Sequence, residues 1–160
     1  MVWARRRFLG VMAALMGSRS GSSQTALAPG CKVFSPHRAR TVEAIAEQII
    51  PKDDTPGAND AGVLYYIDRA LAGNLRRHRS KYLNGLGLVD EASRKKFGKD
   101  FVDLARDRQA EVLQTLEAGP GAGAEFFQLI RLHTMEGFYG HPRYGGNHNY
   151  LSWKMLGFKG

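Results

Sequence analysis

The sequence predicts an all-α fold: a single irregular helical domain of about five to six helices. Apolar residues recur three and four positions apart in several segments, and no segment shows sustained period-two alternation. Glycine and proline interrupt the chain between these segments, where helices are expected to end. With 160 residues, of which 43% are hydrophobic, the chain is long enough to bury one core. There are no internal repeats.

The helical part is predicted to begin near Pro36, with a first helix capped by Thr41 and ended by Pro51. Its apolar residues lie at helical spacing: Val42, Ile45, Ala46, Ile49 and Ile50. The loop that follows, 51–62, carries three aspartates. They lack the alternating ligands and the terminal glutamate of an EF-hand loop, so turn and cap roles are favoured over calcium binding.

Five further helical segments are predicted. A helix over 63–71 ends near Gly73, and a longer one covers 74–97, where Gly85 and Gly87 weaken or bend it or let another backbone approach. A short helix near 101–104 leads into a helix over 108–117. After the flexible 119–123 connection, the last long helix covers 124–139. Its apolar side is formed by Phe126, Phe127, Ile130, Thr134 and Phe138.

The last twenty residues have an unusual composition for a chain terminus, with four glycines, four aromatic residues and two histidines. The aromatic residues are Tyr144, Tyr150, Trp153 and Phe158. Termini are often poorly ordered, but large apolar side chains need a surface to pack against, and glycines permit tight turns and close approach. The sequence therefore predicts a structured Gly/aromatic C-terminal tail that is docked on another surface.

The N-terminus has the outline of an export signal. Four arginines and no acid lie within 1–28, and Arg5, Arg6, Phe8 and Leu9 match the twin-arginine pattern. The apolar run that follows is shorter than the ~20 residues that span a bilayer. The sequence thus predicts a signal segment at 1–28 and a helical domain at 29–160.

The remaining charge does not indicate nucleic-acid binding. Without the four arginines of the signal segment, the formal net charge falls from +8 to +4, and the remaining basic residues are interspersed with acidic ones along the chain. The basic run 76–79 has no interleaved aromatic residues, which favours a solvated helix face. A mixed, solvated surface is predicted, and no nucleic-acid partner.

The usual signals of catalysis are missing from the sequence. Cys31 is the only cysteine and lies in the irregular segment before the helices, and there is no strand-linked GxGxxG, nucleophile elbow or phosphate loop. His133, His141 and His148 are spaced by eight and seven residues, so a shared metal is geometrically possible. Ordinary hydrogen-bonded histidines are favoured. We therefore predict no catalytic, cofactor-binding or metal-binding residue, and a binding or assembly role. The alternative is a stand-alone periplasmic metal-binding enzyme, or a binding protein, that uses these three histidines.

Three groups of motifs resemble a known family. They are the twin-arginine start; the run 41–51 followed by 54–58, 61–63 and 66–68; and the tail motifs 144–147, 153–154 and 157–158. In these residues the chain resembles gluconate 2-dehydrogenase subunit 3, the small (gamma) subunit of membrane-bound FAD-dependent dehydrogenases. The likeness covers the mature domain nearly end to end. Lys159 departs from it, because the family more usually ends Gly-Phe-Pro-Gly.

The resemblance implies a role as a non-catalytic subunit. The expected large partner is a GMC-type flavoprotein that holds FAD and oxidises a CH–OH group of a sugar or sugar acid, and a cytochrome c subunit is expected beside it. The small subunit would escort the flavoprotein through the twin-arginine export machinery and stay bound to it in the periplasm, at the inner membrane. FAD is expected in the partner and no cofactor in this chain.

The tail motifs are candidates for binding that partner, because aromatic anchors dominate interface energetics. The alternative is that they pack inside the chain's own domain. The candidate residues are Tyr144, Gly145, Gly146, Asn147, Trp153, Lys154, Gly157 and Phe158.

Overall fold

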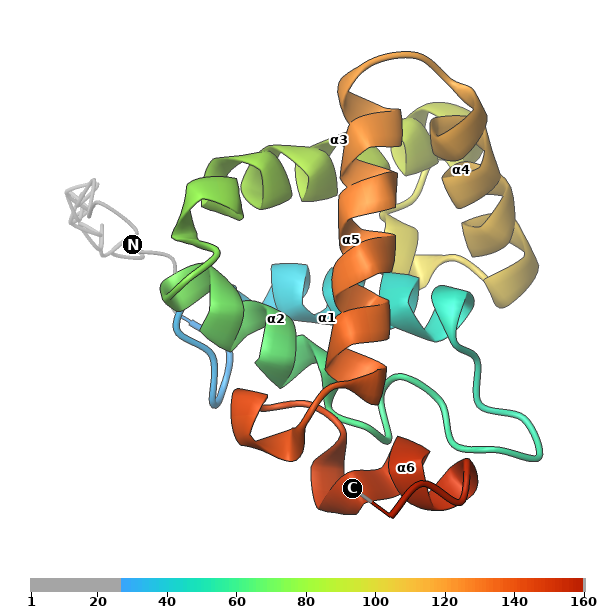
Figure 1. Ribbon diagram of the computed structural model, residues 1–160. Helices are drawn as coiled ribbons and strands as arrows, with labels where there is room; N and C mark the ends of the chain where they lie inside the picture. The colour runs from blue at the N-terminus through green and yellow to red at the C-terminus, as the bar shows by residue number, and fades with distance from the viewer. Residues whose placement is uncertain (1–26, 160) are drawn as a thin grey trace, which may run out of the picture.

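The computed structural model describes residues 27–159 and confirms the all-α class (Figure 1). Within that range there is no strand. The α-helices are α1 (Pro36–Ile49), α2 (Val63–Ala72), α3 (Arg79–Phe97), α4 (Arg106–Ala118), α5 (Ala122–Tyr139) and α6 (Leu151–Met155). Four 3-10 turns join them: η1 (Arg76–His78), η2 (Phe101–Asp103), η3 (Pro142–Tyr144) and η4 (His148–Tyr150).

The twin-arginine motif predicted at Arg5, Arg6, Phe8 and Leu9 lies outside the described residues. It stays a prediction from the sequence.

Two predicted helix boundaries were wrong. The first helix begins at Pro36 and not after Thr41, because proline has a backbone angle suited to the first helical position and lacks only a donor that would be unpaired there. Thr41 is buried inside α1, where its hydroxyl donates to the carbonyl of His37 (3.0 Å). The helix predicted over 74–97 is divided, since the 3-10 turn η1 precedes α3.

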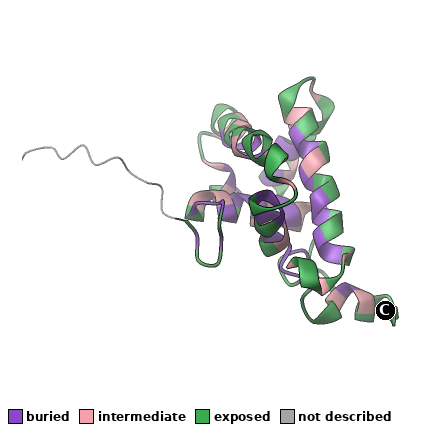
Figure 2. Ribbon diagram, turned by 60° about the vertical axis from the view of Figure 1, so that its left-hand side comes forward, coloured by how far each residue is buried: buried purple, intermediate pink, exposed green. Residues whose placement is uncertain are grey.

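Helix α5 lies at the centre of the arrangement and packs against α1, α2, α3 and α4 (Figure 1). Buried residues recur along it at helical spacing, and they include every member of the predicted apolar side. Figure 2 shows buried positions on the sides of the helices that face one another. The largest fully buried side chains come from the N-terminal loop, α3, η2 and α5: Phe34, Tyr82, Phe101, Phe126 and Phe138.

Gly85 determines how closely α3 and α5 approach. A Cβ atom at this position would overlap the ring of Phe126, which meets Tyr82 edge-on with ring centroids 5.5 Å apart. Gly87, two residues further along α3, has open space where its side chain would be. The two glycines were predicted together as weak points of the helix, but only Gly85 is required by packing. The group that approaches it is a side chain and not a backbone.

These two glycines make a matched pair of variants. Gly85→Ala is expected to lower the free energy of unfolding by about 1–3 kcal/mol, because the methyl group overpacks the core. Gly87→Ala is expected to raise it by about 0.5–1 kcal/mol, because alanine loses less entropy in a helix. Urea unfolding of both variants measures the difference. Equal effects of the two substitutions would contradict the packing assigned to Gly85.

The segment before α1 is held by a buried carboxylate. Asp68 of α2 is only 2% exposed, and it accepts hydrogen bonds from the backbone N–H groups of Lys32 (2.6 Å), Val33 (2.9 Å) and Phe34 (3.1 Å). The loop closes on itself because the N–H of Ala28 donates to the carbonyl of Phe34 (2.8 Å). From the sequence, the helical part was predicted to begin near Pro36, and this loop was predicted to be irregular. It is part of the packed domain.

Cys31 lies in this loop and is buried. Burial, followed by the nearby carboxylates of Asp68 and Glu43, raises the pKa of its thiol to about 11. The residue is therefore a protonated thiol at neutral pH, and thiols in this form are poor nucleophiles and metal ligands.

Removing the charge of Asp68 should release the loop. Asp68→Asn keeps the shape of the side chain but places an amide donor where the carboxylate accepts from backbone N–H groups. We expect a loss of about 2–3 kcal/mol in the free energy of unfolding, as for hydrogen bonds to charged groups. Asp54→Asn is the control, because Asp54 is exposed and makes no hydrogen bond among residues 27–159. Similar urea midpoints for both variants would show that the carboxylate does not hold the loop.

Candidate functional site

The C-terminal tail is docked on α5 through small and polar residues. Gly146 lies so close to α5 that a Cβ atom there would overlap the carbonyl of Gly137. Gly137 in turn faces Tyr66, whose ring carbon would lie 2.9 Å from a Cβ at that glycine. The tail therefore crosses the helix backbone closely at Gly146, where only glycine fits, while Gly137 leaves room for the ring of Tyr66 from α2.

Asn147 fixes the tail from inside. It is fully buried, and its amide nitrogen donates to the carbonyl of Gly140 (2.9 Å). Its amide oxygen accepts from both the backbone N–H and the hydroxyl of Ser152 (2.9 Å each). The side chain thereby joins the end of α5 to the start of α6. Asn147 itself has a positive φ of 45°, which asparagine adopts more readily than most residues.

A second attachment reaches α2. The N–H of His148 donates to the carbonyl of Ala61 (3.1 Å), and its ring stacks on Tyr65 with centroids 6.1 Å apart. A Cβ atom at Gly62, the residue before α2, would overlap the imidazole. The tail is thus held at two places, one on α5 and one on α2.

The outer side of the tail carries an exposed aromatic cluster. The ring of Trp153 lies 5.3 Å from Tyr150, 5.5 Å from His141 and 4.9 Å from Phe158, measured between centroids. The indole N–H of Trp153 donates to the carbonyl of Tyr139 (2.7 Å). These rings, together with Lys154 and Lys159, line a hollow of about 540 Å³.

We call this region the C-terminal surface and define it by Tyr139, Tyr150, Trp153, Leu156 and Phe158. Leu156 is 62% exposed and Phe158 is 57% exposed. Leu132 and Met135 extend it along α5, because they lie seven and four residues before Tyr139 and are also exposed. Large exposed apolar side chains in such numbers are typical of interaction sites.

The predicted partner-binding residues therefore divide into two sets. Gly146 and Asn147 are buried and hold the tail to its own domain. The exposed members are Tyr144, Lys154, Gly157 and Phe158, while Gly145 and Trp153 are intermediate. None of the four tail aromatics is buried: Tyr144, Tyr150 and Phe158 are exposed, and Trp153 is intermediate.

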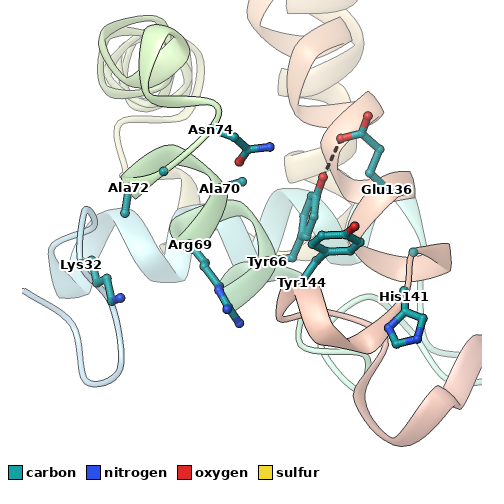
Figure 3. A pocket seen from close by; sticks show the side chains of 11 residues that line it. Lys32, Tyr66, Arg69, Ala70, Ala72, Asn74, Glu136, His141 and Tyr144 are labelled. Atoms are coloured by element: carbon teal, nitrogen blue, oxygen red, sulfur yellow. Dashed lines mark hydrogen bonds between the residues drawn. The ribbon is translucent and has the colours of Figure 1, made fainter.

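A second depression, of about 660 Å³, adjoins this surface between α2, α5 and η3 (Figure 3). The hydroxyl of Tyr66 donates to the carboxylate of Glu136 (2.8 Å) on one side of it. Partial burial and the neighbouring carboxylate raise the pKa of Tyr66 well above its usual value, so the phenol stays protonated. Arg69 lies on another side and donates to the carbonyl of Arg143 (3.1 Å). Tyr144 was predicted to bind the partner, and Tyr66 lies in the 66–68 motif, but the site as a whole was not predicted, because its residues come from separate segments.

The three histidines considered as metal ligands do not come together. His133 is buried on α5, and its Nδ1 lies 2.9 Å from the hydroxyl of Tyr82, while burial lowers its pKa. His141 and His148 lie in the tail, and each has a hydrogen bond of its own. Among residues 27–159, no three His, Cys, Asp or Glu side chains are placed to hold a metal ion. The metal-enzyme alternative is therefore not supported by their geometry.

The structure also contains a carboxylate–imidazole pair that was not predicted from the sequence. Nε2 of His37 lies 2.6 Å from a carboxylate oxygen of Asp90, and the other oxygen accepts from the N–H of Phe101 (3.1 Å). The pair joins α1, α3 and η2. No spacing in the sequence indicates this contact, since the two residues are 53 positions apart.

Comparison with known proteins assigns the chain to a family. Residues 36–160 match the family model described as gluconate 2-dehydrogenase subunit 3. The chain belongs to the gluconate 2-dehydrogenase subunit 3 family. The match begins at the first residue of α1 and includes the docked tail, so both are parts of one family domain. Membership implies that the chain is a small subunit of a multi-subunit dehydrogenase.

Searches of curated proteins and of solved structures found no match. Among the described residues, no helix has the length and apolar character needed to cross a membrane.

The docking of the tail can be tested at its crossing with α5. Gly146→Ala is expected to displace the tail, because the added methyl group meets the backbone of Gly137, which cannot move like a side chain. We expect amide hydrogen exchange across 147–155 to be faster by about tenfold or more, which corresponds to a loss of ~1.4 kcal/mol. Gly87→Ala, where the added methyl group meets open space, is the control. Unchanged exchange at Ser152 in the Gly146 variant would disprove this account of docking.

Proposed function

We propose that this chain is the non-catalytic small (gamma) subunit of a periplasmic, inner-membrane-associated FAD-dependent dehydrogenase of the gluconate 2-dehydrogenase type. It binds the GMC-type flavoprotein subunit and escorts it through twin-arginine export. The observation that carries the proposal is the exposed aromatic C-terminal surface, in a chain that belongs to this family of dehydrogenase subunits.

The C-terminal surface has the properties of a protein interface. Aromatic side chains anchor interfaces because they bury large area with few rotatable bonds. Here the rings of Tyr150, Trp153 and Phe158 support one another, and the indole is fixed by its hydrogen bond to Tyr139. Little conformational entropy would be lost on binding, so more of the contact energy would appear as affinity. The hollow between the rings could receive an apolar side chain of the flavoprotein.

The export role rests on the twin-arginine pattern at Arg5 and Arg6. A flavoprotein that already holds FAD is folded, so it has to leave by a route that accepts folded cargo. If it lacks an export signal of its own, it can leave only while bound to a chain that has one. Binding through a surface that is complete before export would meet this need.

The chemistry of the complex would lie in the other subunits. FAD in the flavoprotein would accept the electrons of the oxidised CH–OH group, and a cytochrome c subunit would pass them towards the membrane. Substrate contacts would belong to the flavoprotein, and this chain would supply assembly and location.

A charged residue placed in the C-terminal surface should break the complex. Leu156→Asp and Phe158→Asp are expected to reduce co-purification with the flavoprotein at least about tenfold, because each buries an unpaired carboxylate at an apolar contact. Both side chains are more than half exposed, so the fold of the free chain should survive; circular dichroism checks this. The conservative variants Leu156→Met and Phe158→Leu are the matched controls.

Export is tested separately by Arg5→Lys together with Arg6→Lys. This variant should keep the flavoprotein bound but leave dehydrogenase activity in the cytoplasm. Undiminished recovery of the complex with both aspartate variants would refute the interface. Undiminished periplasmic activity with the lysine pair would refute the escort role.

A further inference from the structure

We infer that the depression between α2, α5 and η3 is a carboxylate-binding pocket that receives an acidic side chain of the flavoprotein subunit. We call it the Arg69 pocket and define it by Lys32, Tyr66, Arg69, Asn74, Glu136 and His141. The inference rests on the proposed function, because it states the chemistry of the partner's contact.

Two cations of the Arg69 pocket have no acidic partner. Lys32 and Arg69 are exposed, and neither forms a salt bridge with any residue in 27–159. Segment 1–26 contains no Asp or Glu that could pair with them. Figure 3 shows both side chains on one side of the pocket, apart from the Tyr66–Glu136 hydrogen bond. The pocket therefore has positive charge that is not neutralised by its own acids.

Arg69 is held in position for a ligand. One of its guanidinium nitrogens donates to the carbonyl of Arg143 in η3, and this bond limits the freedom of the side chain. A guanidinium carries five N–H groups, so most of its donors are still available. The fork of donors matches the two oxygens of a carboxylate, and pairs of this kind are among the strongest hydrogen bonds in proteins.

The other polar groups of the pocket also favour an anion. Nδ1 of His141 accepts from the N–H of Arg143 (3.1 Å), so this nitrogen offers no donor that would compete for the acids of the pocket. The amide of Asn74 adds a further donor. Glu136 is the only acid that lines the pocket, and it already accepts from Tyr66 (2.8 Å). Donors thus outnumber acceptors, and a negatively charged acceptor is the ligand that satisfies them.

The position of the pocket indicates that the carboxylate belongs to the partner protein. His141 lines both the Arg69 pocket and the aromatic hollow of the C-terminal surface. A protein that covers that surface would therefore reach the pocket as well. At its rim the guanidinium of Arg143 lies over the ring of Tyr144 (4.8 Å), which is 49% exposed, and arginine and tyrosine are enriched at interfaces. An acidic residue beside the apolar anchors would fix how the two proteins are aligned in the complex.

The pocket can be tested on the full chain without the flavoprotein. A tri-glutamate peptide, titrated at low salt, is expected to shift the backbone amide signals of Gly73, Asn74, Gly140 and His141 in a saturable way. The double variant Lys32→Gln/Arg69→Gln should weaken this binding about tenfold or more, because it removes both cations. A variant with Lys32→Gln and Arg69→Lys, which keeps one cation, should bind the peptide more tightly than the double glutamine variant. Lys99→Gln is the control, since Lys99 is exposed beyond the far end of α3 and its ammonium has no partner among the described residues.

The same variants are then measured in complex with the flavoprotein. The double variant should bind about tenfold more weakly and show a flatter dependence of affinity on salt, whereas Lys99→Gln should match the wild type. Absence of peptide shifts, or equal shifts in the double variant, would overturn the pocket whether or not the flavoprotein binds. Peptide binding with unchanged complex affinity would overturn the partner assignment and indicate a site for a free carboxylate. Failure of the wild-type chain to bind the flavoprotein would refute the proposed function, and with it the assignment of an acidic partner residue.

Discussion

The close contact between Gly146 of the tail and Gly137 of α5 is the constraint on which the functional surface depends. Gly146 cannot carry a side chain there, because a Cβ atom would overlap the backbone of Gly137. The crossing brings Asn147 into the interior, where its amide joins the end of α5 to the start of α6. Together with the bonds of His148 to Ala61 and of Trp153 to Tyr139, this contact fixes the position of the aromatic cluster.

Helix α5 connects the core to the surface. Its inner side supplies Phe126, Ile130 and Phe138 to the core, and its C-terminal end supplies the carbonyl groups that hold Asn147 and Trp153. The same helix contributes Tyr139 to the C-terminal surface and Glu136 to the Arg69 pocket. A partner that binds there would therefore contact groups whose positions are set by the central helix of the domain. Sites supported by rigid elements in this way need little rearrangement on binding.

Local patterns in the sequence predicted much of the fold but little of the site. The apolar spacing along α2 and α5 is a local property, so those helices could be predicted closely. The predicted start of α1 was wrong because the N-cap was assigned to Thr41, although Pro36 is suited to the first position of a helix. The binding of the 28–34 loop by Asp68 could not be predicted, since it joins positions about 35 residues apart. The Arg69 pocket was missed for the same reason, as four separate segments form it.

The tail shows how a correct prediction can rest on an incomplete reason. Its aromatic residues predicted docking, but the residues that dock it are small or polar, and the aromatic rings face outward. If the rings served to anchor the tail to its own domain, Phe158 would not be more than half exposed. The backbone also adopts positive φ at Asn147, Asn149 and Tyr150, which is costly for residues other than glycine. The buried hydrogen bonds of Asn147 offset part of this cost, but the exposed ring of Phe158 adds little to the core. The arrangement is better accounted for by a second surface that the rings are positioned to meet.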